Sequence, residues 1–458
     1  TGIMDNDKSA EDEPSVETGV GIPTDATEFY EDYHNYLKQC GVDGVKVDAQ
    51  GVVGVLRSQP PDTTNVYDLK PAVDDLQNAL ADSVDQRFRS TATPSLIQCM
   101  AHDPQILYRI PQRYADSLPL LRASDDHYPD NDFSHGPHIV ACAFNSLLLG
   151  RLAVPDWDMF RTDLTDERSV RLHAVSRCIS GGPVYVSDPP HRIRREVIDW
   201  ISCQDGTILA CNDTALPVAA SLLDDPLALG AKPLVIFNIN GRSGVTSGLL
   251  GVFHLAGSGT WDYDALDYVS TERRLNPDVL HAVDLSPSFI PQFITTDDSF
   301  LAVPFFDKRH AWLLDSSHSS MTIVLAKLAC DVITMVPITK LKTGVHMAAL
   351  GYAGMINGAG AVVENNIVDS STVQLTLKGC GTFVAAYRAV DGAGSTSLSV
   401  ALDGEIVEYD TIVWDSMDDH HLPLGVLRLG YNLVAIPIAP SDQQEQSITI
   451  SFTKSSNL

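Results

Sequence analysis

The sequence predicts an α/β region with a parallel sheet, followed by an all-β region that folds as an antiparallel β-sandwich. Between residues 26 and 203, segments with helical spacing of apolar residues alternate with short apolar runs, as in parallel α/β sheets. From residue 229 onward, short strand-like runs are separated by Gly, Asn, Asp and Pro turns. We therefore place an acidic flexible loop at 1–25, an α/β domain at 26–228 and a β-sandwich domain at 229–458.

The α/β domain is predicted to alternate helix and strand. The segment 1–25 is nearly free of large apolar residues and is predicted to be a loop. The first helix then runs to Gly41, with apolar residues at helical spacing (Phe29, Tyr33, Tyr36, Leu37 and Cys40). Strands are predicted at 44–48, 95–103, 118–126, 151–160 and 182–188, and further helices around 73–84, 138–149, 166–178 and 191–203.

Charged residues gather where the predicted strands end. They are Lys46, Asp48, His102, Asp103, Asp125, Asp126, Asp156, Asp158 and Asp188. In a (β/α)8 barrel the active site lies at the carboxyl ends of the strands, so such an accumulation is typical of that fold. Only five strands are visible, and five cannot close an eight-stranded barrel. The residues leave two alternatives: the later part of a barrel whose first strands lie upstream, or an open sheet.

The composition narrows the class of ligand. The formal net charge of -28 and the isoelectric point near 4.6 disfavour phosphate backbones and anionic lipid surfaces. We therefore expect no nucleic-acid or membrane partner. The eight cysteines lie mostly in apolar runs without a CxxC pair, which predicts buried reduced thiols and favours a cytoplasmic protein.

The stretch GVKVD (44–48) ends in two opposite charges. Because side chains alternate along a strand, Val45 and Val47 are predicted to face the helices while Lys46 and Asp48 face the other side. A neighbouring lysine lowers the pKa of an aspartate, which suits a nucleophile. The competing interpretation is a buried ion pair.

Two further strand ends supply carboxylates. RASDD (122–126) places Asp125 and Asp126 near Arg122, and two acids on different strands are what glycoside hydrolysis requires. The alternative is that one of them caps a helix or pairs with the arginine. In PDWDMF (155–160), Trp157 between two acids resembles a sugar platform, although packing is the commoner role of a tryptophan.

Other chemical templates are missing. The sequence contains no GxSxG, HExxH or Walker-type motif, and nucleotide binding is unsupported. His135, His138 and His173 are too dispersed in the sequence to predict a metal site. No cofactor and no metal are therefore expected.

Six segments together carry a specific resemblance. In chain order they are GVKVDAQ, QCMAHD, RASDDHYP, SHGPHI, LAVPDWDMF and SGGPVYVSD. Over roughly residues 26–260 the chain resembles the raffinose synthase, seed imbibition protein and alkaline α-galactosidase family, within glycoside hydrolase family 36. The resemblance implies a (β/α)8 TIM barrel between β-domains, with this chain covering about strands 4 to 8 and the C-terminal β-domain.

The resemblance also implies site residues. Through the Lys-x-Asp and Arg-x-x-x-Asp motifs of the family, Asp48 is the expected nucleophile and Asp126 the acid/base, with Asp125 as competitor. Lys46 is expected to hydrogen-bond galactose hydroxyls. The other expected substrate-binding residues are His102, Arg122, Asp125, Asp156, Trp157 and Asp158. Asp103 stands where plant members have asparagine, which leaves the acceptor preference open.

The predicted function is a retaining α-galactosidase that releases terminal α-galactosyl residues of raffinose-type oligosaccharides through a galactosyl-enzyme. The alternative is a galactosyltransferase of the raffinose synthase type, which moves galactose from galactinol to sucrose. A third possibility, from another class, is a non-catalytic carbohydrate-binding or truncated protein. In the first two cases the partner is a galactosyl oligosaccharide or another galactoside.

Overall fold

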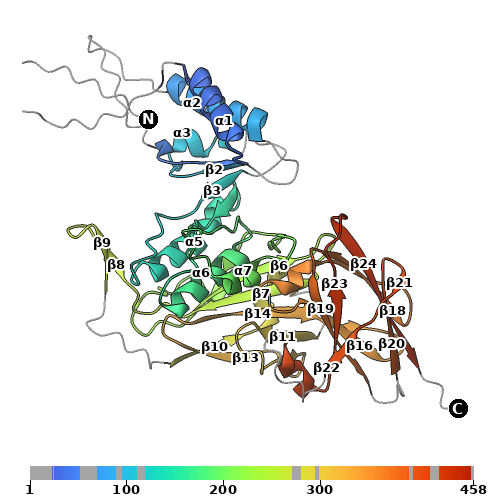
Figure 1. Ribbon diagram of the computed structural model, residues 1–458. Helices are drawn as coiled ribbons and strands as arrows, with labels where there is room; N and C mark the ends of the chain where they lie inside the picture. Colours follow the sequence, from blue (N-terminus) through green and yellow to red (C-terminus); the bar gives the residue numbers. More distant parts are fainter. Residues whose placement is uncertain are drawn as a thin grey trace, which may run out of the picture. The chain divides into compact units, whose positions relative to one another are not determined.

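The structure, a computed structural model, describes residues 23, 25–51, 70–88, 95–110, 119–270, 280–293, 299–390, 396–412 and 422–454. The chain divides into two compact units, the first made of residues 1–123 and 148–156 and the second of 124–147 and 157–458 (Figure 1). The loop predicted at 1–25 lies almost entirely outside the described residues, and the domain boundaries drawn from the sequence stay predictions. None of the described helices combines the length and apolar character that a bilayer-spanning segment needs.

The first unit holds a parallel sheet. Among its described residues, β1 (Val45–Val47), β2 (Leu96–Gln98), β3 (Leu120–Arg122) and β4 (Val154–Asp156) pair in this order, each parallel to the next. The helices are α1 (Ala26–Gln39), α2 (Lys70–Phe88) and α3 (Pro104–Leu107). The predicted alternation of helix and parallel strand is confirmed here. Closure into a barrel stays a prediction.

Strand β1 separates apolar from charged side chains, as its sequence predicts. Val45 and Val47 pack in a cluster with buried apolar residues of α2, among them Leu80, Val84 and Phe88. Helix α1 adds apolar side chains to the same cluster. It is capped by Asp25, whose carboxylate accepts a hydrogen bond from the Glu28 backbone N–H at 3.0 Å. The alternation of a strand therefore directs Lys46 away from the helices.

The second unit contains most of α5 (His135–Leu149), all of α6 (Glu167–Ser180) and α7 (Arg195–Ile201). The predicted strand at 182–188 is reduced to one parallel bridge, between Phe160 and Val186. Helix α6 is buried over most of its length and packs against a β-sheet (Figure 1). It ends at Gly181, whose φ of +77° and contact with the Asp213 carbonyl leave no room for a Cβ atom.

That sheet has six antiparallel strands in the order β12-β11-β14-β7-β6-β5. Their bounds are β5 (Leu216–Pro217), β6 (Leu234–Asn240), β7 (Ser247–Phe253), β11 (Phe300–Pro304), β12 (Trp312–Leu314) and β14 (Cys330–Pro337). A two-stranded sheet, β10 (Leu280–Leu285) with β13 (Met321–Ala326), shares an apolar cluster with it. Another hairpin pairs β8 (Thr260–Asp262) with β9 (Asp267–Val269).

The last part of the chain is a β-sandwich of two five-stranded sheets around one apolar core. One sheet is β15 (Thr339–Lys340), β16 (Val345–Tyr352), β19 (Gly381–Ala389), β23 (Asn432–Ile438) and β22 (Asp410–Ile412). The other is β17 (Val362–Ile367), β18 (Thr372–Lys378), β24 (Glu445–Lys454), β20 (Thr396–Leu402) and β21 (Glu405–Ile406). The alternating residues Val373, Leu375 and Leu377 are buried, as predicted.

Two kinds of β-structure lie within the range 229–458 that is predicted for the sandwich. Within the described residues, the two facing sheets use strands from residue 339 onward, whereas 216–337 builds the sheet that covers α6. Every residue of β7 is buried, because α6 and the β10–β13 side cover its two faces. Short apolar runs in the sequence do not reveal whether a helix or a second sheet covers a strand.

Candidate active site

Asp48 follows β1 on an exposed and conformationally constrained turn. The backbone N–H of Ala49 donates to Asp48 Oδ1 at 2.7 Å, and Ala49 has a φ of 56°, in the left-handed region that alanine rarely adopts. The Gln50 side chain donates from Nε2 to the Val47 carbonyl at 2.8 Å. These contacts hold the carboxylate at the strand end, with its surface open to solvent.

The surroundings of Asp48 favour its ionised form. Partial burial is the largest single effect and raises the pKa of this carboxyl, but the hydrogen bonds from the Cys99 thiol and the Ala49 N–H and the charges of Arg122 and Lys46 together outweigh it. The net pKa of Asp48 lies below its usual value. The effect predicted for Lys46 is therefore present, but it is the smallest of these contributions, and no sequence pattern singles out Cys99.

Arg122 and Asp156 occupy paired positions on the adjacent strands β3 and β4. Both are buried, with 2% and 0% of their surfaces exposed, and the Ala123 N–H donates to the Asp156 carbonyl at 2.8 Å. In the described residues of the first unit they belong to the interior of the sheet. The charge of Arg122 still reaches Asp48 and lowers its pKa. We therefore expect Arg122 and Asp156 to position other residues of the site. His102, which follows β2, is exposed.

Asp125 and Asp126 lie on the exposed loop that follows β3 and belong to the second unit. Buried side chains hold this loop in place. The Ser124 hydroxyl lies 2.9 Å from His138 Nε2, and the His127 backbone N–H donates to Asp158 Oδ2 at 3.3 Å. Asp48 belongs to the first unit, so the separation of the two proposed catalytic carboxyl groups stays a prediction.

Trp157 and Asp158 are fully buried. The Trp157 indole N–H donates to the Ser146 hydroxyl at 3.1 Å, so the packing role holds and a sugar has no free ring face to stack on. Asp158 has a φ of 65°, and its Oδ1 accepts from the Met159 N–H at 2.9 Å. The structure therefore corrects the prediction that these two side chains contact substrate: Trp157 is packed and bonded to Ser146 of α5, and Asp158 fixes the loop after Asp126.

His127 of that loop belongs to a buried cluster of histidines with His135 and His173. Arg177 donates to His173 Nδ1 at 2.5 Å, and His173 Nε2 lies 2.7 Å from His135 Nδ1. A guanidinium only donates, so His173 carries its proton on Nε2 and donates it to His135. Arg177 also donates to the carbonyl oxygens of Asp158 and Met159, at 3.1 and 3.2 Å. Burial lowers the pKa of His135 to about 4.

His135 and His173, which are too far apart in the sequence to predict a metal site, come together in this cluster with His127. Among the described residues, possible ligand atoms of His127, His135 and His173 lie within 4.8 Å of one another, close enough to hold a metal ion. Both ring nitrogens of His173, however, are engaged in hydrogen bonds, and the Arg177 cation lies beside it. A divalent cation would have to displace that guanidinium, so the donor set does not fit a metal. The cluster is instead tied to Arg177, which also donates to the carbonyl oxygens of Asp158 and Met159.

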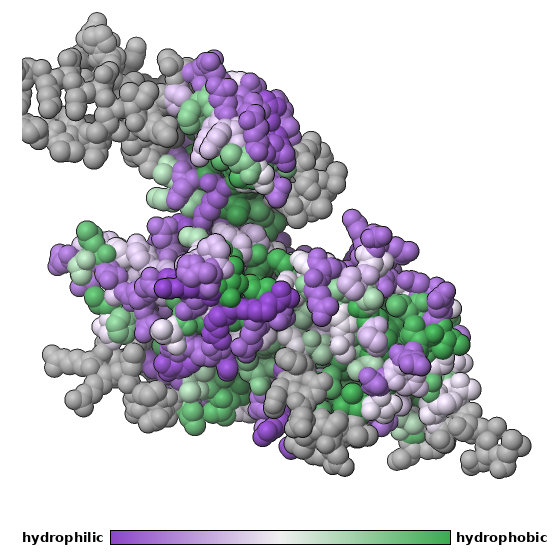
Figure 2. Space-filling view, viewed as in Figure 1, coloured by the Kyte–Doolittle hydropathy of each residue, from purple (hydrophilic) through white to green (hydrophobic). Residues whose placement is uncertain are grey.

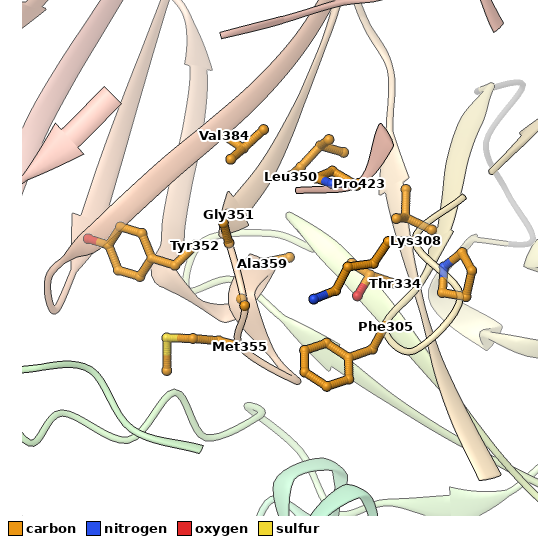
Figure 3. Close-up of a pocket in the computed structure, with 15 residues that line it drawn as sticks. Phe305, Lys308, Thr334, Leu350, Gly351, Tyr352, Met355, Ala359, Val384 and Pro423 are labelled. Carbon is orange, nitrogen blue, oxygen red and sulfur yellow. The ribbon is translucent and has the colours of Figure 1, made fainter. Parts of the chain in front are cut away.

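A separate cavity of about 490 Å³, including its open mouth, lies between strands β11 and β14 on one side and β16 on the other. Phe305, Lys308 and Tyr352 are among its lining residues (Figure 3). The Lys308 ammonium lies 5.2 Å from the centre of the Phe305 ring. None of the residues predicted for galactoside chemistry lines it.

Comparison with known proteins decides the family. The model of the family described as raffinose synthase or seed imbibition protein Sip1 matches residues 1–416. The chain belongs to this family. It is 32% identical over 419 residues to galactinol–sucrose galactosyltransferase of Pisum sativum, covering 86% of this chain and 48% of the relative. It is 31% identical over 405 residues to probable galactinol–sucrose galactosyltransferase 6 of Arabidopsis thaliana, covering 85% and 50%.

The stachyose synthase of Pisum sativum is a further relative, 27% identical over 378 residues, with 80% of this chain and 42% of the relative covered. The chain thus spans about half the length of these members of the raffinose synthase family. Among solved structures, a GH27 β-L-arabinopyranosidase from Geobacillus stearothermophilus shows a TM-score of 0.41 and 13% identity, covering 69% of this chain and 62% of that one. So low a structural likeness carries no weight for fold or function.

Proposed function

We propose that the full-length protein is a retaining galactosyltransferase that moves an α-galactosyl group from a galactoside donor to a sugar acceptor. The observation that carries the proposal is Asp48, an accessible carboxylate at a strand end whose pKa is held below its usual value. The relatives are named as galactinol–sucrose galactosyltransferases and a stachyose synthase, which favours transfer over the hydrolysis that the sequence predicts first.

In the proposed reaction Asp48 attacks the anomeric carbon of the donor while Asp126 protonates the departing glycosidic oxygen. The products of this step are a covalent galactosyl-enzyme and the free leaving group. Asp126, now ionised, then takes the proton of an acceptor hydroxyl as that oxygen attacks the anomeric carbon and releases Asp48. When the acceptor is water, the same steps give hydrolysis.

The partners of Asp48 suit the first step. A nucleophile must be ionised when the donor binds, and the Cys99 thiol, the Ala49 N–H and the cations Arg122 and Lys46 all stabilise the charged form. The same donors weaken as Asp48 loses its charge to the sugar, so they also favour its release in the second step. Lys46 is proposed to bind a galactose hydroxyl as well.

The test uses the full-length protein with galactinol as donor and sucrose as acceptor. We expect trisaccharide formation by the wild type and its loss in Asp48→Asn. The matched control is Asp43→Asn, which changes an exposed aspartate just before β1 and should keep full activity. A 2-fluorogalactoside should label Asp48 covalently. Equal turnover by the wild type and Asp48→Asn, or a label on another residue, would remove Asp48 from the mechanism.

A further inference from the structure

The β8–β9 hairpin is fastened to the loop that carries Asp125 and Asp126. The side-chain amide of Asn131 donates to Asp267 Oδ1 at 2.8 Å and to the Tyr268 carbonyl at 2.9 Å. At the base of the hairpin, the Gly259 N–H donates to the Phe133 carbonyl at 3.0 Å. Although more than 120 residues separate Asn131 from the hairpin in sequence, both belong to the second unit (Figure 1). The hairpin is therefore positioned relative to the proposed acid/base.

Three aromatic rings meet at this junction. Tyr128, two residues after Asp126, lies with its ring centre 5.8 Å from that of Trp261 and 5.7 Å from that of Tyr268. Trp261 and Tyr268 face each other across the hairpin at 5.2 Å. Tyr128 remains 37% exposed and the other two rings are half-buried. Figure 2 shows hydrophilic and hydrophobic residues mixed over the hairpin rather than one apolar patch.

The cluster also has a carboxylate beside it. Burial raises the pKa of the Tyr268 phenol, and the nearby Asp125 carboxylate and the Tyr128 phenol raise it further. Asp125 is exposed, so its oxygens are accessible to a ligand. An aromatic face next to a hydrogen-bond acceptor matches a pyranose ring, which has an apolar C–H face and hydroxyl donors around its edge.

Packing explains only part of this arrangement. The contact between Trp261 and Tyr268 is a cross-strand pair that stabilises the hairpin by itself. Tyr128 comes from a distant segment, two residues after Asp126, and adds a ring that remains 37% exposed. In a double displacement, the acid/base contacts the oxygen of the leaving group and later that of the acceptor, so the surface next to it binds the sugar that is not being transferred.

We propose that Tyr128, Trp261, Tyr268 and Asp125 form the acceptor subsite, which binds a pyranose ring of the leaving or accepting sugar beside Asp126. The inference rests on the proposed function and adds to it the residues that select a sugar over water. In this assignment Asp125 binds an acceptor hydroxyl and Asp126 keeps the acid/base role. Occupation of the subsite excludes water from the galactosyl-enzyme and favours transfer.

The test measures the ratio of transfer to hydrolysis in the full-length protein, with galactinol as donor and sucrose as acceptor. For Trp261→Ala and Tyr128→Ala we expect the KM for sucrose to rise on the order of tenfold and the ratio to fall by a similar factor. Tyr263→Ala is the matched control, since this tyrosine lies in the turn of the same hairpin and is 84% exposed. The control should keep the wild-type ratio.

Calorimetric titration of sucrose into the same proteins separates the subsite from turnover. Weaker sucrose binding by both alanine variants, together with wild-type binding by Tyr263→Ala, would support the subsite. If the wild type hydrolysed the donor but transferred nothing to sucrose, the proposed transfer would be refuted while this evidence for the subsite would stand. An unchanged ratio and unchanged sucrose binding in Tyr128→Ala would overturn the subsite. So would an equal loss of transfer and hydrolysis in Trp261→Ala, which would show a structural effect only.

Discussion

The turn after β1 and the turn after β4 look alike but hold their acids in opposite ways. In the first turn, Asp48 precedes Ala49, which has a left-handed backbone with a φ of 56°. In the second turn, Asp158 itself has a left-handed backbone with a φ of 65°. Asp48 is exposed and its pKa is lowered by the Cys99 thiol, a backbone N–H and two cations. Asp158 is fully buried and accepts hydrogen bonds from the backbone N–H groups of His127 and Met159.

A carboxylate at the end of a parallel strand is therefore not a reacting group by virtue of its position alone. Strained backbone is common at functional sites, and here it occurs at both turns. The two aspartates differ in solvent exposure and in their hydrogen-bond donors. Asp48 is accessible to a ligand, whereas Asp158 uses its oxygens to hold a loop. The following predictions test this division of roles.

The largest effect is expected for Asp48→Asn. An amide cannot form the galactosyl ester at a useful rate, so kcat for galactinol should fall by roughly 10⁴-fold while the urea midpoint stays near that of the wild type. Steady-state kinetics and urea unfolding measure the two quantities. A large loss of stability would place Asp48 with Asp158 among the structural acids.

Arg177→Met should produce the largest loss of stability. This arginine is fully buried and donates to two carbonyl oxygens and to His173, which would lose these donors. We expect a cost of about 3–5 kcal/mol in the free energy of unfolding, seen as a lower urea midpoint. Arg195→Met is the control: it breaks an exposed pair with Asp199, worth at most about 1 kcal/mol. A similar midpoint in both variants would contradict the structural role.

Trp157→Phe distinguishes packing from sugar binding at the turn after β4. The change removes the hydrogen bond to Ser146 and some buried volume, so it should cost about 1–3 kcal/mol of stability. The KM for galactinol should stay within twofold of the wild type. An increase of KM by tenfold with unchanged stability would restore the sugar-platform prediction.

Cys99→Ala should move the pH dependence of the first chemical step. The thiol favours ionised Asp48, so its removal raises the pKa of Asp48 toward the ordinary value. Because the nucleophile must be ionised, the acid limb of the kcat/KM profile for the donor should shift to higher pH, with activity lost at pH values where the wild type still works. Cys99→Ser keeps a donor and should retain the wild-type limb. A shift to lower pH would refute this assignment.

The smallest effect is expected for Ala49→Gly. Glycine adopts positive φ without a Cβ penalty, so this change should stabilise the first unit by up to about 1 kcal/mol. The same substitution at Ala81, inside α2, should instead cost about 1 kcal/mol. Urea unfolding of the two variants measures the difference. Equal signs would show that Ala49 is not strained.

The prediction from sequence was strongest where local patterns set the structure. The spacing of apolar residues located α1, α2, α5 and α6, and the alternation in GVKVD separated the valines from Lys46. It was weaker for the site. Cys99 and Arg177 carry no motif, and the gathering of His127, His135 and His173 depends on contacts over tens of residues.

The order of helices and parallel strands, the acids at the strand ends and the family resemblance can be predicted from the sequence, because each depends on residues close together in the chain. Four features depend on packing between distant segments: which acids remain accessible, the burial of Trp157, the cover of a six-stranded sheet by α6, and the contact of the β8–β9 hairpin with the loop after Asp126. Burial and long-range hydrogen bonds arise when distant segments pack, and no local pattern encodes them.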